Sequence, residues 1–192
     1  MPRERRTRRE SFRQPKRAIL LYCGAERTEP DYFEGFKVLL EGASVTIKVR
    51  AAGTDPVRLI RYAADYRDRK PGVFDEVWCV FDVDRFNVAK AVSTAQALDI
   101  KVAVSNPCFE LWLLLHHADC RAHCGDYEAV ALRLKKHVPS YDKTGLEFAA
   151  FAGGVHEAVR RAEALDPSGA DHLRNPSTSV WVLVKQLLEH VR

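Results

Sequence analysis

The spacing of hydrophobic residues along the chain alternates between two periods. Short apolar runs of strand length occupy residues 17–23, 44–53, 76–84 and 101–105. Between them, apolar residues recur at the three- and four-residue intervals of a helix that buries one face, over residues 28–42, 54–70 and 87–99. Strands that alternate with helices in this way predict right-handed βαβ crossovers and a mostly parallel sheet.

Beyond Pro107 the hydrophobic spacing is helical throughout. Helices are predicted over residues 109–117, 126–138, 145–165 and 177–191. The chain shows no Gly/Ser-rich linker and no internal repeat, so residues 17–192 are interpreted as one domain. The predicted fold class is therefore α/β, with a mostly parallel sheet flanked by helices and a helical C-terminal half.

Composition fits a globular protein, with 46% hydrophobic and 29% charged residues among 192. No apolar run reaches the roughly 18 residues that span a bilayer. The N-terminal segment is basic rather than apolar, unlike a secretory signal, and we expect a cytoplasmic protein. Cys120 and Cys124 lie near three histidines, but their spacing is not that of a standard zinc site, so reduced and unligated thiols are expected.

Positive charge is concentrated in the first 17 residues. This segment has eight basic and two acidic residues, and because the whole chain carries +4, the remainder carries −2. Residues 1–16 have little apolar surface to bury and are predicted to be a disordered tail. The tail could contact nucleic-acid phosphates, increase solubility, or meet an acidic partner. The candidate nucleic-acid-binding residues are Arg5, Arg6, Arg8, Arg9, Arg13, Lys16 and Arg17.

The stretch EVWCVFDVDRF, residues 76–86, ends a hydrophobic strand in Asp82 and Asp84. Aspartate is depleted in strands because its side chain bonds local backbone groups, so the pair needs an explanation. Residues i and i+2 of a strand point to one face, about 7 Å apart at about 3.3 Å per residue. Two carboxylates at that separation repel each other unless a cation lies between them.

Further carboxylates follow the neighbouring strands. Because parallel strands bring their carboxyl ends to one edge, these groups are expected to converge there. An oxygen-only set suits Mg²⁺ or Mn²⁺ and favours phosphoryl transfer or phosphodiester hydrolysis. The candidate metal ligands are Glu26, Glu29, Asp82 and Asp84, and the candidate catalytic residues are Glu26, Asp82, Asp84 and Glu110. The alternative roles are helix caps for Asp82, Asp84 and Glu110, or ion pairing of the aspartates with Arg85.

Five segments resemble the RloB-like family in their order along the chain and in their residues. They are LLYCGAERTEPDYFEGF, VFDVDRF, AVSNPCFELWLLLHH, YDK and NPSTSVWVLVKQL. The resemblance runs from about residue 17 to the C-terminus, and the basic tail is similar too. It implies a Toprim-like fold, the metal-binding α/β module of topoisomerases, primases and nucleases of the overcoming-lysogenization-defect type. It also implies a role in prokaryotic anti-phage defence, often beside an ABC-type ATPase encoded as a neighbour.

One position departs from the Toprim pattern, which places a Glu directly after the first strand and Asp-x-Asp after the third. The second element matches at Asp82 and Asp84. Family members commonly have Cys-Glu-Gly-Glu-Lys-Thr-Glu at the first, whereas this chain has CGAERTE and places Gly24 where the Glu is usual. Glycine cannot ligate a metal, so either Glu26 or Glu29 supplies the carboxylate or the site is weakened.

Two functions of different classes follow. The first is a Mg²⁺-dependent nuclease in phage defence. The second is a catalytically weakened Toprim-like module that binds nucleic acid or an ATPase partner without cleavage. A third, more distant hypothesis is a metal-dependent phosphotransferase or small-nucleotide enzyme. The chain has no Gly-rich phosphate loop of the Walker type, so ATP hydrolysis is assigned to the partner and not to this protein.

Overall fold

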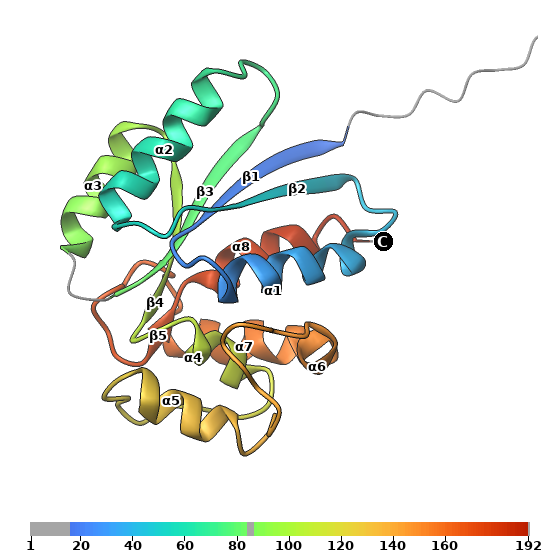
Figure 1. Ribbon diagram of the computed structural model, residues 1–192, viewed down its shortest axis with the longest axis vertical. Helices are drawn as coiled ribbons and strands as arrows, with labels where there is room; N and C mark the ends of the chain where they lie inside the picture. The colour runs from blue at the N-terminus through green and yellow to red at the C-terminus, as the bar shows by residue number, and fades with distance from the viewer. Residues whose placement is uncertain (1–15, 84–86, 192) are drawn as a thin grey trace, which may run out of the picture.

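Five strands form one sheet in the order β2-β1-β3-β4-β5 (Figure 1). The computed structural model describes residues 16–83 and 87–191. The strands are β1 (Arg17–Cys23), β2 (Val45–Ala51), β3 (Glu76–Asp82), β4 (Lys101–Asn106) and β5 (Ser177–Thr178). The first four are parallel and β5 is antiparallel to β4, which confirms the predicted α/β fold and its mostly parallel sheet.

Helices cover both faces of the sheet and make up most of the C-terminal part (Figure 1). The N-terminal half contains α1 (Thr28–Phe36), the 3₁₀ helix η1 (Lys37–Leu40), α2 (Pro56–Asp68) and α3 (Val88–Ala97). The C-terminal half contains α4 (Glu110–Leu115), α5 (Tyr127–Leu134), α6 (Ala149–Ala152), α7 (Val155–Leu165) and α8 (Val180–Leu188). None of the helices in the described ranges combines the length and apolar character of a transmembrane span.

Side-chain alternation along β3 divides the core between the two faces. Trp78 and Val80 pack in the larger hydrophobic cluster, with residues of α1, α4, α7 and α8. Val77, Cys79 and Phe81 pack in the smaller cluster, with α2 and α3. By the same alternation Asp82, the next residue after Phe81, points to the face of the sheet that carries the larger cluster, where the C-terminal helices pack.

The prediction of one continuous helix over residues 145–165 was wrong, because the segment divides into α6 and α7 at Gly153 and Gly154. A Cβ atom at Gly154 would lie 2.4 Å from the His116 carbonyl oxygen. Only glycine allows the chain to pass this close to the end of α4. The pair of glycines thus ends one helix and lets the next begin against α4.

The start of the last predicted helix was also wrong, because residues 177–178 form β5 and α8 begins at Val180. Ser105 and Thr178 are partners in the β4–β5 register, and their hydroxyl oxygens lie 2.9 Å apart. The two-residue strand extends the sheet beyond β4 and holds the start of α8 beside it. Its pairing joins segments more than 70 residues apart, which the local pattern could not reveal.

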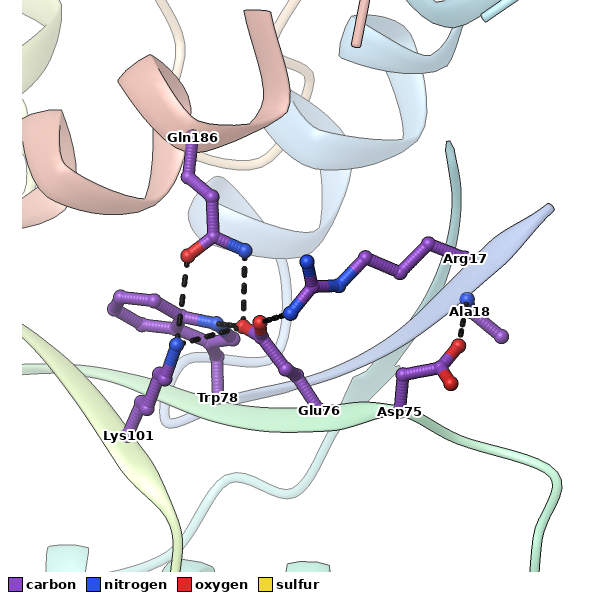
Figure 2. A network of polar contacts seen from close by, with 7 residues as sticks. All are labelled: Arg17, Ala18, Asp75, Glu76, Trp78, Lys101 and Gln186. Atoms are coloured by element: carbon purple, nitrogen blue, oxygen red, sulfur yellow. Dashed lines mark hydrogen bonds and ion pairs between the residues drawn. The ribbon is translucent and has the colours of Figure 1, made fainter. Parts of the chain in front are cut away.

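A polar network ties the amino ends of the strands together (Figure 2). Glu76 at the start of β3 accepts hydrogen bonds at Oε2 from Trp78 Nε1 at 3.0 Å, Lys101 Nζ at 3.0 Å and Gln186 Nε2 at 2.9 Å. Its other oxygen pairs with Arg17 at the start of β1. Burial alone would raise the pKa of Glu76, but these hydrogen bonds and the Lys101 charge lower it to about 2. One carboxylate thus connects β1, β3, β4 and α8.

This network predicts an acid-sensitive contribution to stability. Because the folded pKa of Glu76 lies below its usual 4.5, its contribution is present above that pH and is lost as the pH falls towards 2. Replacing Glu76 by Gln should lower the free energy of unfolding at pH 7 by about 1–3 kcal/mol, discounted for the exposed partners. Urea denaturation at pH 7 and pH 3 should show the difference from wild type shrinking at pH 3.

The matched control is Glu157→Gln. Glu157 also accepts from arginine, with Arg160 Nη2 at 2.7 Å, but it lies on the exposed face of α7. Exposed pairs of this kind contribute little to stability, because solvent screens them. Equal effects of the two substitutions at both pH values would contradict the assigned role of Glu76.

Candidate functional site

Three carboxylates converge where β1, β3 and β4 end. Glu29 lies in the first turn of α1, directly after the β1–α1 connection. Asp82 is the last residue of β3, and its backbone is the register partner of Ser105 in β4. Glu110 is the first residue of α4, four residues after β4 ends. The parallel order of the three strands therefore brings residues 29, 82 and 110 to the same edge of the sheet.

Burial and mutual repulsion make this cluster electrostatically costly. Burial raises the pKa of Glu29 to about 7, and the charge of Glu110 adds to the shift. Burial likewise raises the pKa of Asp82 well above its usual range, with further contributions from Glu29 and Glu110. Contacts with backbone N–H groups, such as that of Phe109 with Asp82, act in the opposite direction but do not balance the burial. At neutral pH the cluster of three carboxylates is therefore stabilised by binding a proton or a cation.

Two oxygens of the cluster lack a protein partner. Glu29 Oε2 and Asp82 Oδ1 are shielded from solvent and accept no hydrogen bond from the described residues. Buried polar atoms are nearly always satisfied, so such atoms point to a ligand, a water molecule or a functional role. Glu110 differs, because its Oε1 accepts a hydrogen bond from the Tyr141 hydroxyl at 2.8 Å. Glu110 is thus the fixed member of the cluster, and Glu29 and Asp82 have free acceptor capacity.

A cleft of about 610 Å³ opens beside Asp82. Its walls include Pro107 and Cys108 from the β4–α4 connection, Tyr127 at the start of α5, and Lys143. Lys143 Nζ lies 4.4 Å from the centroid of the Tyr127 ring. The Lys143 charge also lowers the pKa of both Glu29 and Asp82, although burial and repulsion outweigh it. In the residues that the structure describes, the site therefore combines acidic groups, the Lys143 cation and an accessible cavity.

Lys143 and Tyr141 were not proposed as site residues from the sequence. They lie in a loop about 60 residues beyond β3, and no periodic pattern connects them with Asp82. The Thr28 hydroxyl donates to the Lys143 carbonyl at 3.2 Å and holds this loop against the start of α1. The only signal available was the segment YDK, residues 141–143, which resembles the family without revealing a role.

The remaining candidates near the strand ends are placed differently. Glu26 is exposed and lies beside Gly53, after β2, and it does not contribute to the pKa shifts of Glu29 or Asp82. Asp84, the second aspartate of the pair, lies outside the described residues. The structure also bears on the helix-cap alternatives. Asn87, and neither aspartate, caps α3, and Phe109 rather than Glu110 is at the cap position of α4.

The candidate nucleic-acid residues lie mostly outside the described ranges. This applies to Arg5, Arg6, Arg8, Arg9 and Arg13. Lys16 is exposed, and Arg17 begins β1, where it pairs with Glu76. Since β1 runs from Arg17 towards the carboxylates, Arg17 lies at the amino ends of the strands, at the opposite end of the sheet from Asp82.

The thiols of Cys120 and Cys124 form a pair, and no third metal ligand joins them among the described residues. Cys120 Sγ and Cys124 Sγ lie 3.3 Å apart, and Arg133 Nη1 lies 3.2 Å from Cys120 Sγ. His116 is instead a core residue bonded to Tyr32, and burial lowers its pKa to about 3. Over residues 16–83 and 87–191, no three His, Cys, Asp or Glu side chains form a group that could hold a metal on their own. A metal at the carboxylates would therefore need further oxygens.

The raised pKa values predict that stability falls with pH in the absence of divalent ions. A carboxyl group whose folded pKa exceeds its unfolded value loses stability as the pH rises between the two, which for Glu29 means from about 4.5 to about 7. Replacing Glu29 by Gln should remove on the order of 2–3 kcal/mol of this decline. Urea denaturation in EDTA from pH 4.5 to 8 measures it, with exposed Glu26→Gln as the control. Parallel curves for wild type and both variants would contradict the proposed burial of Glu29.

Comparison with known proteins identifies the family. The model of the family described as "RloB-like protein" matches residues 19–187, from β1 into α8. The match includes all three clustered carboxylates, Lys143 and β5. The searches of curated proteins and of solved structures gave no match.

Proposed function

Because the chain belongs to the RloB-like family, we propose that it is a divalent-metal-dependent nuclease that acts on nucleic acid in prokaryotic anti-phage defence. The observation that carries the proposal is that Glu29 and Asp82 each have a shielded, unpartnered oxygen, and that Asp82 lines an open cleft. Buried carboxylate oxygens with a purely structural role usually have a protein or water partner. The proposal includes a Toprim-like site and an ABC-type ATPase partner, both from the resemblance alone.

The residues fit Mg²⁺ or Mn²⁺ in donor chemistry. Both unpartnered atoms are carboxylate oxygens, the ligands that these hard cations prefer. Mg²⁺ commonly uses one or two protein carboxylates and completes its shell with waters and substrate phosphates, so a third protein ligand is not essential. Glu29 and Asp82 would hold the ion, together with Asp84. The bound ion would supply an activated water and neutralise charge on a phosphodiester.

The other residues of the site have separate roles in this proposal. Lys143 faces the cleft and can bind a phosphate of the substrate as a point charge. Tyr127, in contact with the Lys143 ammonium, orients it. Glu110 is positioned by the Tyr141 hydroxyl and keeps the edge of the sheet acidic, which raises the affinity of the site for cations.

The alternative function is a Toprim-like module that binds nucleic acid or an ATPase without cleavage. The observation that favours it is Gly24, which stands where the Toprim pattern has its first Glu. The two functions give opposite results when labelled DNA and RNA are incubated with the protein in Mg²⁺, in Mn²⁺ and in EDTA. Cleavage that requires the metal supports the nuclease, and binding without cleavage supports the module. Neighbouring genes that encode an ATPase would support the proposed partner.

Substitutions of the strand-end acids test the metal site. Asp82→Asn and Asp84→Asn keep the side-chain size but remove the charge, and they should abolish metal-dependent cleavage, with a fall of at least about 100-fold. Glu29→Gln should cause a loss of similar size. Glu26→Gln serves as the matched control and should remain active, because Glu26 is exposed and outside the cluster. Circular dichroism checks that the variants fold. Full activity in both aspartate variants would eliminate the assignment.

Deletion of residues 1–16 tests the tail. A segment that buries little should leave the melting temperature nearly unchanged when it is removed. The deletion should weaken nucleic-acid binding and flatten the dependence of log K on log salt, because fewer counterions are released. Fluorescence anisotropy with labelled oligonucleotides in EDTA measures both quantities. An unchanged slope would assign the tail to another role.

A further inference from the structure

Three cationic side chains surround the ring of Tyr66, and a fourth lies near its neighbour Tyr22. Arg50 Cζ lies 4.5 Å from the centroid of the Tyr66 ring, Lys70 Nζ lies at 5.4 Å and Lys48 Nζ at 5.6 Å. Arg69 lies close enough to Tyr22, the neighbour of Tyr66, to lower its pKa, although burial raises it more. We call residues 48, 50, 69 and 70, with Tyr66, the Tyr66 cation cluster.

The sheet topology explains why these charges gather. β2 is an edge strand, and its Val45 and Ile47 point into the larger hydrophobic cluster. Lys48 and Arg50 alternate with them and therefore point to the opposite face, where α2 packs. Tyr66 lies in the last turns of α2, and Lys70 follows the end of that helix. In the part of the chain that the structure describes, no strand lies beyond β2, and the four cations of the cluster are exposed.

The described residues provide no close counter-charge for the cluster. In the described part of the chain, none of its four cations lies within 4 Å of a carboxylate oxygen. Other basic residues differ, because Arg17 and Lys101 share Glu76, and Arg67 pairs with Asp68. The interaction with Lys48, together with the Lys70 and Arg50 charges, lowers the pKa of Tyr66, as these nearby positive charges favour the ionised phenol. Like charges at this spacing repel, and a bound anion would relieve the repulsion.

We infer that the Tyr66 cation cluster binds the phosphate backbone of a nucleic-acid strand. The inference rests on the proposed function for its choice of partner and adds a surface on the folded body, separate from the basic tail. Several cations set around an aromatic ring, with the exposed ring of Tyr62 one turn earlier on α2, suit a sugar–phosphate chain with bases that stack. Arg50 is the penultimate residue of β2, so the surface extends towards the edge of the sheet that carries Asp82.

The double variant Lys48→Gln/Arg50→Gln tests the surface in the full-length protein. Anisotropy titrations of labelled single-stranded and duplex oligonucleotides, in EDTA and across a KCl series, avoid any dependence on cleavage. Two lost phosphate contacts should reduce the salt slope by about 1.8 for duplex and about 1.4 for single strands, at about 0.9 and 0.7 per contact. Affinity at low salt should fall by at least about tenfold, with the melting temperature unchanged or higher because repulsion is removed.

The matched control is Lys135→Gln/Lys136→Gln, which removes the same charge from exposed residues just after α5. Its slope should stay close to that of wild type. Equal slopes for the two double variants would overturn the inference, because net charge alone would then explain binding. Binding of wild type to vesicles containing phosphatidylserine, together with no binding to oligonucleotides, would also overturn it and would indicate a membrane surface.

The two proposals fail in different ways. A slope that changes in the cluster variant, in a protein that never cleaves DNA or RNA, supports the binding surface and eliminates the nuclease. Metal-dependent cleavage that is lost in Asp82→Asn, with a slope that responds to deletion of the tail but not to the cluster variant, supports the nuclease and eliminates the cluster. A change in both supports both.

Discussion

The pairing of β3 on both sides determines where the functional groups of this protein lie. β3 is parallel to β1 on one side and to β4 on the other, and its last residue is Asp82. A slip of one residue would turn Trp78 and Val80 out of the larger hydrophobic cluster and send Asp82 to the opposite face. The apolar part of the strand therefore fixes the position of an acidic group that contributes nothing to the core. The hydrophobic effect supplies the energy, and the carboxylate is held where that energy places it.

The two ends of β3 show opposite electrostatics on the same scaffold. At the amino end, cations and hydrogen-bond donors lower the pKa of Glu76 to about 2, so its negative charge stabilises the fold. At the carboxyl end, burial and the charge of Glu29 raise the pKa of Asp82 far above its usual range. A strand with a stabilised charge at one end can tolerate an unfavourable one at the other. An unfavourable charge such as that of Asp82 is expected where it binds a ligand. Functional sites commonly contain groups with shifted pKa values, and the rest of the fold supplies the stability that such groups cost.

The sequence was sufficient for the parts of the fold that depend on local periodicity. Four strands, their parallel orientation and the convergence of carboxylates at the strand ends follow from apolar runs and from the rule on strand ends. It was insufficient where a contact joins distant segments, as in β5 and in the loop of Lys143, because no spacing in the chain connects those residues with the sheet. The choice between Glu26 and Glu29 was also open, although for a local reason. It depends on the turn between β1 and α1, which buries Glu29 and leaves Glu26 outside.

The geometry around Gly24 bears on what the departure from the Toprim pattern means. Gly24 continues the β1–β3 pairing, with its N–H donating to the Val80 carbonyl at 2.8 Å. A Cβ atom there would lie 3.3 Å from Phe81 Cβ, and Phe81 packs in the cluster under α2 and α3. A side chain at this position would therefore start on the face opposite to the one that carries Trp78 and Val80, and would compete with Phe81 for space. Glycine relieves that crowding, and Glu29 brings a carboxylate to Asp82 from the first turn of α1. With glycine at position 24, the acids that remain at this edge of the sheet among the described residues are Glu29, Asp82 and Glu110.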